Sequence, residues 1–146
     1  MAGAAGCDPA GTVHASCVAL AGRAALILGA AGRGKSGLAL QLVALGAGLV
    51  ADDRTRLWRA GARVMADAPD TIRGRIEARG LGILRLPAAG PHPLALVIDL
   101  DRDETDRLPP PRETRIKGAA LPLVHGCGHA HFPAAILLYL RYGELE

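Results

Sequence analysis

The fold of this chain is decided by one short stretch, Gly29-Ala30-Ala31-Gly32-Arg33-Gly34-Lys35-Ser36. The stretch fills every fixed position of the phosphate-binding pattern G-x-x-x-x-G-K-[ST]. Glycines in such a loop let successive backbone N–H groups point inward at phosphate oxygens. The lysine supplies a cation to the β- and γ-phosphates, and the serine hydroxyl reaches Mg²⁺, which prefers oxygen ligands. Residues 29–36 are therefore predicted to bind a nucleotide or a polyphosphate.

The segments on either side of this loop agree with that interpretation, because a phosphate loop joins a strand to a helix. The apolar run Ala24 to Leu28 predicts a buried strand, and Ser36 to Leu45 carries leucines at helical spacing. Gly46 follows the expected helix and ends it. The first turn of this helix directs the positive end of its dipole at the phosphates. We therefore expect an α/β fold with a P-loop nucleotide-binding core.

Length and composition restrict the class of protein further. The chain has 146 residues, which suits one domain with its own core. Aromatic residues make up only 3% of the chain, so small aliphatic side chains must fill that core. The formal net charge of +3 comes without a block of one sign, and the scarcity of aromatic side chains argues against nucleic-acid binding. We expect an N-terminal tail at residues 1–11 and one P-loop domain at residues 12–146.

Cysteine usage and apolar runs indicate the compartment. The cysteines are Cys7, Cys17 and Cys127, an odd number without C-x-x-C spacing, which predicts no disulfide framework and fits a reducing cytoplasm. The apolar run Ala134 to Leu140 is far shorter than the ~20 residues of a membrane span, so it belongs to a terminal helix from Phe132 to Tyr142. We expect a cytoplasmic protein without a membrane partner.

The remaining patterns predict a mixed sheet with hairpins and a C-terminal helix. Thr12 to Leu20 predicts a strand that forms a hairpin with the strand before the phosphate loop. Thr55 to Ala60 and Arg63 to Ala66 predict a second hairpin around Gly61. The charged segment Arg102 to Pro111 is expected to be a connection whose acids and bases face solvent.

Two runs have the form of a buried strand that ends in an acid. Ala47 to Ala51 leads into Asp52-Asp53, and Leu94 to Ile98 leads into Asp99. Such strands deliver carboxylates to the C-terminal edge of a sheet. One carboxylate of an adjacent pair can hold Mg²⁺ through its water shell, while the other accepts a proton from an attacking hydroxyl. Periodicity alone does not choose between the two runs.

The stretch His125-Gly126-Cys127-Gly128-His129-Ala130-His131 leaves two interpretations open. In an extended conformation, period-2 alternation puts all four potential ligands on one face, and tetrahedral zinc takes such ligands. Same-face neighbours on a strand are, however, about 7 Å apart, so a zinc site needs a turn that the glycines could allow. We favour a glycine-rich loop that contacts phosphate or substrate.

Four segments together resemble the bacterial HPr kinase/phosphorylase family, specifically its catalytic C-terminal domain and the short forms associated with alphaproteobacteria. They are His14 in Val-His-Ala, the loop through Ser36, Leu49 to Asp53, and Ile76-Glu77-Ala78-Arg79-Gly80-Leu81-Gly82-Ile83. The last segment reproduces the family's I-E-x-R-G-L-G-I signature and is the most specific of the four. The phosphate loop alone is shared with a very large class of proteins.

The resemblance implies a P-loop kinase domain that uses ATP and Mg²⁺ to phosphorylate a serine of HPr, the phosphocarrier of the sugar phosphotransferase system. In the family, the aspartate that matches Asp52 accepts the proton in kinase turnover and donates it in the reverse phosphorolysis. The histidine that matches His14 lies near this base. The resemblance makes Asp99 a structural or secondary acid. The implied catalytic residues are Asp52, His14 and Lys35, and the implied metal ligands are Ser36, Asp53 and Glu77.

The chain also departs from the family pattern. It has Ala31 where the family usually has serine, and it lacks the arginine-asparagine stretch that precedes the family's final helices. The altered C-terminal region permits a second interpretation, in which a non-catalytic P-loop sensor uses the nucleotide to switch a partner surface. Asp52 separates the two, because a sensor needs no general base. The expected partners are an HPr-like phosphocarrier protein and ATP, with a homo-oligomer as a further possibility.

Overall fold

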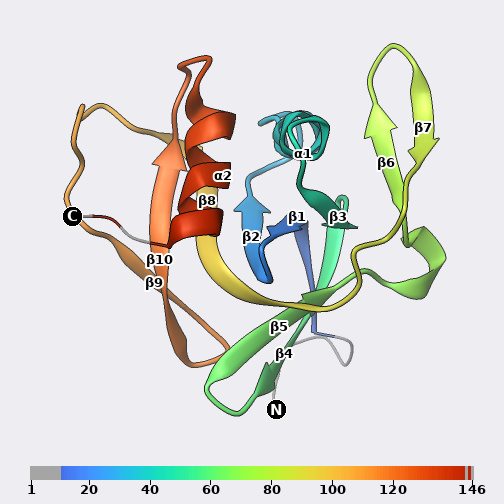
Figure 1. Cartoon of the computed structure of the whole chain (residues 1–146), viewed down its shortest axis with the longest axis horizontal. Coiled ribbons are helices and arrows are strands. Elements are labelled where there is room, and N and C mark those ends of the chain that lie inside the picture. Colours follow the sequence, from blue (N-terminus) through green and yellow to red (C-terminus); the bar gives the residue numbers. More distant parts are fainter. Residues whose placement is uncertain (1–10, 144, 146) are drawn as a thin grey trace.

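The computed structural model describes residues 11–143 and 145, so the predicted tail at residues 1–11 lies outside the described residues except for Gly11. Strands predominate, and two α-helices and a short 3₁₀ helix complete the fold (Figure 1). In chain order the elements are β1 (Thr12–Leu20), β2 (Arg23–Leu28), α1 (Lys35–Ala44), β3 (Gly48–Ala51), β4 (Arg54–Ala60), β5 (Arg63–Asp67), η1 (Asp70–Ile72), β6 (Arg75–Ala78), β7 (Gly82–Arg85), β8 (His92–Asp103), β9 (Glu113–Ile116), β10 (Ala119–Gly126) and α2 (Phe132–Tyr142).

The main sheet folds over on itself because two of its strands pair with different neighbours at their two ends. Its order is β2-β1-β4-β5-β8-β10-β9, with β3 beside β1 and an additional pairing between β2 and β8. Residues 12–14 of β1 pair with β4, whereas residues 15–20 pair with β2. Strand β8 likewise pairs with β5 at its start and with β2 further along. The β4–β5 hairpin therefore lies across one face of the central strands, and α1 and α2 cover the other (Figure 1).

Four strands run in the same direction and bring their carboxyl ends to one edge. Strand β2 is parallel to β8, and β8 is parallel to β10. Strand β1 is antiparallel to both β2 and β3, so β3 has the same direction as β2. Ligands of α/β sheets bind beyond the carboxyl ends of parallel strands. The predicted phosphate loop, the Asp52-Asp53 pair and the segment after β10 all begin at this edge.

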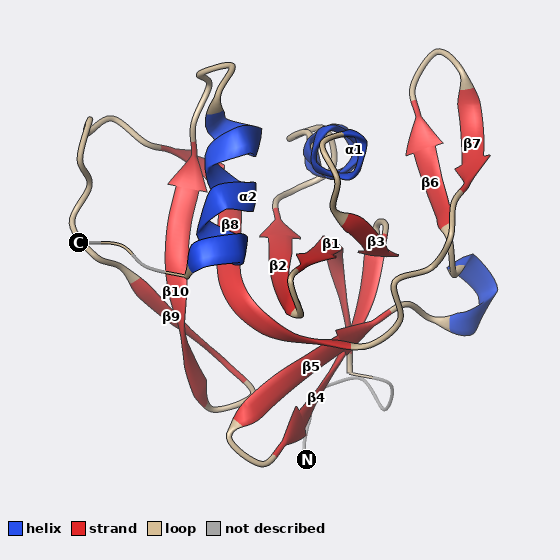
Figure 2. Cartoon of the chain, viewed as in Figure 1, coloured by secondary structure: helices blue, strands red, loops and turns tan. Residues whose placement is uncertain are grey.

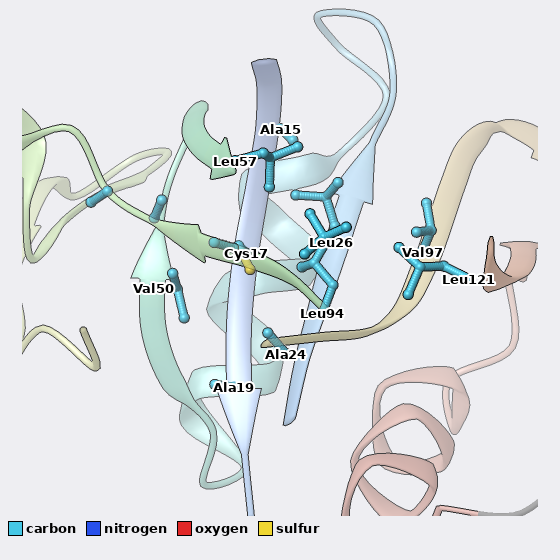
Figure 3. Packing of buried hydrophobic residues seen from close by; sticks show 14 residues of the cluster. Ala15, Cys17, Ala19, Ala24, Leu26, Val50, Leu57, Leu94, Val97 and Leu121 are labelled. Carbon is cyan, nitrogen blue, oxygen red and sulfur yellow. The ribbon is translucent and has the colours of Figure 1, made fainter. Parts of the chain in front are cut away.

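The core has two layers because the central strands are buried on both faces. Alternate residues of β2 point into different layers: Ala24 and Leu26 into one, Ala25 and Ile27 into the other. The first layer lies between the central strands and the β4–β5 hairpin, and Figure 3 shows Leu26 and Leu57 in it. The second layer packs against the helices, shown in blue in Figure 2. Continuous apolar runs in β2 and β8 are the sequence mark of this double burial.

Cys17 lies in the first layer and is fully buried. Burial raises the pKa of its thiol well above the ordinary range, and the charge of Asp67 adds to the effect. Because the thiolate is the reactive form, Cys17 is a packing residue. Asp67 also holds the segment between β5 and β6 in place, since Arg73 donates to its two carboxylate oxygens at 2.7 and 3.2 Å.

The structure confirms the mixed α/β fold, both predicted hairpins and the terminal helix Phe132–Tyr142. Three expectations were incomplete or wrong. Strand β8 runs on to Asp103, so Asp99 is not at a strand end; β9 and β10 had no predicted counterpart. Glu104, expected in a solvent-facing connection, has a side chain only 10% exposed and forms an ion pair with Arg112. Within residues 11–143 and 145, no helix is long and apolar enough to cross a membrane.

Candidate functional site

Residues 29–36 join β2 to α1 and fold back over the end of β2. Gly32 and Gly34 have φ values of 87° and 97°, in the left-handed region that favours glycine, and Gly34 caps the start of α1. The Lys35 ammonium donates to the Gly29 carbonyl at 2.6 Å, so its side chain lies along the loop. The first N–H with a helical partner is that of Leu38, which donates to the Gly34 carbonyl at 2.9 Å. The preceding N–H groups of α1 point out of its first turn, as anion binding requires.

The outer side of the loop is tied to the end of β8. The Ala30 N–H donates to the Asp101 carboxylate at 2.9 Å, and the Arg33 guanidinium donates to the Leu100 carbonyl at 2.9 Å. Ala31, the departure from the family pattern, is exposed and lies at the apex of the loop. Sequence reasoning missed Asp101, because it took β8 to end at Ile98.

Asp52, directly after β3, is the most closely held acid of the site. It accepts hydrogen bonds from the Ser36 hydroxyl at 2.6 Å, the Ser16 hydroxyl at 2.8 Å and the Glu77 N–H at 3.1 Å. Its exposed fraction is 7%. An ionised carboxylate offers about four acceptor sites, so one remains after these three bonds. The phosphate loop, β1 and β6 thus hold this carboxylate in a fixed position, with one acceptor site to spare.

Ser16 is a site residue that sequence reasoning missed. It is fully buried on β1, and its oxygen accepts the Asp53 N–H at 3.2 Å while its hydroxyl donates to Asp52. The signal was present, because His14 and Ser16 are two residues apart on a strand and share a face. The prediction that His14 lies near the base could therefore have been extended to Ser16 on the same face of the strand.

The predicted acids gather around one cavity of about 400 Å³. Asp53 has φ of 67°, a left-handed conformation that aspartate tolerates, and its side chain is exposed beside the buried Asp52. Glu77 stands on β6, whose hairpin with β7 forms one wall. His14 is exposed and does not line this cavity, although β1 pairs it with Arg54, which does. The lining residues are Ser36, Asp52, Asp53, Arg54, Ile72, Arg75, Ile76, Glu77 and Ile83.

The oxygen donors of this cavity fit Mg²⁺. Ser36 and Asp52 are already in contact, and Asp53 and Glu77 line the same cavity. Mg²⁺ keeps several waters and takes only one or two carboxylates when substrate phosphates complete its shell. Within residues 11–143 and 145, no group of three or more His, Cys, Asp or Glu side chains is close enough to hold a metal ion by itself.

The segment after β10 forms a loop that lines one cavity together with the phosphate loop, and its contact with phosphate or substrate stays a prediction. The zinc interpretation is wrong for the described residues. No ligand cluster forms there. The His125 Nδ1 lies 3.9 Å from the Glu104 carboxylate, away from the others. His129 and His131 stack on each other, with ring centroids 5.3 Å apart. Cys127 and His129 line a second cavity, of about 310 Å³.

Comparisons with known proteins agree on one family. The family described as HPr Serine kinase C-terminal domain matches residues 8–89. An HPr kinase/phosphorylase of Caldanaerobacter subterraneus is 45% identical over 74 residues, which are 50% of this chain and 24% of that protein. One of Bordetella pertussis is 43% identical over 77 residues, 52% of this chain and 25% of that protein. The matched part thus spans about a quarter of the length of these relatives.

A solved structure extends the similarity beyond the matched sequence. The HPr(Ser) kinase/phosphatase from Coxiella burnetii superposes with a TM-score of 0.76 at 27% sequence identity. The superposition covers 90% of this chain and 95% of that chain. The similarity of fold therefore extends beyond residues 8–89, which the family description matches.

Proposed function

This chain belongs to the HPr Serine kinase C-terminal domain family, and we propose that it transfers the γ-phosphoryl group of ATP to a serine of an HPr-like phosphocarrier protein. The proposal includes the reverse phosphorolysis. The observation that supports it is the hydrogen bond from Ser36 of the phosphate loop to the Asp52 carboxylate, because the serine of such a loop serves Mg²⁺ beside the β- and γ-phosphates. A strand end that supplies an acid to the phosphate loop is what phosphoryl transfer requires.

Binding of the phosphates falls to residues 29–36. The N–H groups of the loop and of the first turn of α1 receive the phosphate oxygens, and the Lys35 ammonium leaves its Gly29 carbonyl to pair with the β- and γ-phosphates. The exchange replaces a neutral acceptor by an anionic one, and charge-assisted hydrogen bonds are about twice as strong as neutral ones. Lys35 therefore stabilises the charge that builds up on the phosphates during transfer.

Asp52 acts as the general base in this proposal. The acceptor serine enters the 400 Å³ cavity, and its hydroxyl oxygen forms the new bond to phosphorus while its proton passes to Asp52. The bond between the γ-phosphorus and the bridging oxygen breaks, and ADP leaves with that electron pair. The acceptor site that remains on the Asp52 carboxylate is where the hydroxyl proton is received. His14 is included in the proposed site because it lies on the same face of β1 as Ser16, whose hydroxyl donates to Asp52.

Ser36, Asp53 and Glu77, which line the same cavity, would hold Mg²⁺. When bound, Mg²⁺ neutralises charge on the β- and γ-phosphates. The exposed side chain of Asp53 and the surface position of Glu77 leave both within reach of solvent, as partial ligation through water requires. Asp52 itself is kept oriented by the hydroxyls of Ser16 and Ser36.

The proposal is tested by incubating the full chain with ATP, Mg²⁺ and HPr-like proteins, followed by mass analysis for phosphoserine. The expected result is one phosphoserine on the acceptor with the unaltered chain and none with Lys35→Ala. Nucleotide binding is measured in parallel. Binding without transfer to any HPr-like protein would reject the kinase and favour the nucleotide sensor, which needs the phosphate loop but no general base.

A further inference from the structure

Two arginines, Arg54 and Arg75, line the 400 Å³ cavity together with its acids. Neither guanidinium forms a hydrogen bond or an ion pair with any of the described residues, although three carboxylates line the same cavity. Arg73 and Arg112, by contrast, are each paired with a carboxylate that helps to hold the fold. The guanidiniums of Arg54 and Arg75 are therefore available to a ligand that enters the cavity.

The main chain fixes the point from which each of these two side chains extends. The Arg54 N–H donates to the Asp52 carbonyl at 2.7 Å, so β4 begins directly beside the proposed base. Arg75 begins β6 after Gly74, where φ is 75° and an added Cβ would lie 2.5 Å from the Leu86 carbonyl oxygen. The Leu86 N–H donates to the Gly74 carbonyl at 2.7 Å and closes the base of the hairpin. Both arginines thus start from a backbone that is held in place.

The β6–β7 hairpin, which stands apart from the main sheet (Figure 1), places another arginine opposite Arg75. Arg75 and Arg85 are direct partners in its register, and both are exposed. Like charges directly opposite each other on two strands are destabilising. Glu77 lies on the same face, but it forms no ion pair with either arginine in the described part of the chain. The hairpin therefore has an excess of positive charge beside the cavity, which a bound anion would neutralise.

The proposed phosphorolysis requires a second anion site, because two phosphate groups must be held at once. A free phosphate on residues 29–36 forms a bond to the phosphorus of a phosphoserine, and the bond from that phosphorus to the serine oxygen breaks. The serine oxygen takes the proton from Asp52, and pyrophosphate leaves. Lys35 and the loop N–H groups serve the phosphate on the loop. The phosphoserine needs other cations, because Asp52, Asp53 and Glu77 repel its charge.

We propose that Arg54 and Arg75 form an anion subsite that binds the phosphoryl group of phosphoserine on the acceptor protein. The inference rests on the proposed function, and it adds the residues that distinguish the phosphorylated acceptor from the unmodified one. A guanidinium binds phosphate through two parallel N–H donors. Two such groups balance the charge of about −2 that phosphoserine carries at pH 7. Free inorganic phosphate has the same chemistry, so the experiment separates the two sources.

The test measures the affinity of the full chain for an HPr-like protein in its serine form and in its phosphoserine form. Saturating ADP occupies the loop, and EDTA removes the Mg²⁺ that transfer requires. Phosphoserine is incorporated during translation, so the supply of this form does not depend on transfer by the chain. Arg54→Gln and Arg75→Gln remove one guanidinium each, and loss of Arg75 relieves its repulsion by Arg85, so that variant folds. Arg63→Gln is the matched control, since Arg63 also begins a hairpin strand and is exposed but does not line the cavity.

We expect the unaltered chain and Arg63→Gln to bind the phosphoserine form more tightly than the serine form. Arg54→Gln and Arg75→Gln should each reduce this preference roughly 10- to 100-fold, the effect of losing one hydrogen bond to a charged group. Arg75→Lys keeps the charge but not the paired donors, so its preference should lie between those of the unaltered chain and Arg75→Gln.

Equal affinity of the unaltered chain for the two forms would overturn the inference, and so would a preference that persists unchanged in either glutamine variant. Transfer of phosphate to the serine form would still leave the proposed kinase standing in these cases. If the chain binds neither form and transfers no phosphate, both proposals are rejected.

Inorganic phosphate gives the second arm of the experiment. It should compete with the phosphoserine form for the unaltered chain and leave binding of the serine form unchanged. If the glutamine variants lose affinity for inorganic phosphate alone and keep their preference for the phosphoserine form, the subsite belongs to free phosphate and the inference is wrong. In steady-state assays the same variants should raise the KM for the phosphoserine form in phosphorolysis more than the KM for the serine form in the kinase reaction. An equal rise in both would indicate a merely structural role and contradict the inference.

Discussion

Replacement of Asp52 by asparagine separates the chemistry of the site from its folding. Asp52→Asn keeps the size of the side chain and removes the base. We expect transfer from ATP to the acceptor to slow by about 10²–10⁴-fold, the usual contribution of a positioned general base. That range equals about 3–5 kcal/mol of activation free energy. Affinity for Mg·ATP should change little, because Lys35 and the loop N–H groups are unaltered.

The hydrogen bonds of Asp52 limit the loss of stability in this variant. If the NH₂ group of the new amide faces Glu77, two donors meet there, and the hydrogen bond from the Glu77 backbone N–H is lost. If it faces the two serines, it donates to both, and the buried Ser16 hydroxyl loses its acceptor. Either orientation leaves one buried donor unpaired, at a cost of about 1–3 kcal/mol. A domain stable by about 5–15 kcal/mol remains folded after such a loss, so a slower transfer rate in this variant would not be caused by unfolding.

The assay is single-turnover transfer from labelled ATP, with ATP affinity and urea unfolding measured on the same preparations. Asp99→Asn is the matched control, since Asp99 is the other acid that follows an apolar run but does not line the 400 Å³ cavity around Asp52. It should retain the unaltered rate. A fully active Asp52→Asn, or a loss confined to Asp99→Asn, would refute the assignment of the base.

Three further changes test other parts of the structure. Lys35→Ala should abolish detectable ATP binding in a nucleotide titration, because the guanidinium of Arg33 in the same loop donates to the Leu100 carbonyl instead; unchanged affinity and turnover would contradict the role of Lys35. Glu77→Gln keeps the N–H that binds Asp52, so it should raise the Mg²⁺ concentration needed for half-maximal rate by about 10- to 100-fold without unfolding the chain; an unaltered Mg²⁺ titration would exclude the metal role. The hydrogen bond from Arg112 lowers the pKa of Glu104, so this pair stabilises the fold above the unfolded pKa of glutamate, and its contribution is lost as pH falls through the lower folded value. Arg112→Gln should therefore unfold at lower urea than the unaltered chain at about pH 7, with a smaller difference at about pH 3, and a difference independent of pH would contradict this explanation.

The part of the fold around β2 and α1 could be predicted because local pattern and tertiary structure agree there. The apolar run of β2 is buried on both faces, and Gly34 is needed for its left-handed φ at the start of α1. Strand β10 was not predicted, because Pro122 and the glycines after Val124 conceal a strand that pairs with β9 at its start and is completed by a parallel pairing with β8. That pairing is between residues far apart in the sequence, which a local pattern cannot show.

The site residues that belong to a sequence motif could be predicted. The residues that reach the site only through the packing of the strands were harder to predict. Glu77 was noted for its carboxylate, yet its contact with Asp52 is made by its backbone N–H, which no side-chain pattern reveals. Ser16 lies within an apolar strand, and its hydroxyl reaches Asp52 only because β1 pairs with β3. Asp99 and Asp52 follow similar runs, but β8 continues past Asp99 while β3 ends at Ala51.

The cavities that border residues 29–36 share no lining residue, and this separation has a kinetic consequence for the proposed kinase. In the proposed reaction, a donor whose phosphates lie on residues 29–36 leaves the 400 Å³ cavity open to the acceptor, so we expect both to be bound together before any bond breaks. Initial-rate plots at several fixed acceptor concentrations should then intersect, as for a ternary complex, and not run parallel, as they do when the protein itself carries the phosphoryl group. The proposed reaction would then release ADP and the phosphorylated acceptor in either order, which product-inhibition patterns can show.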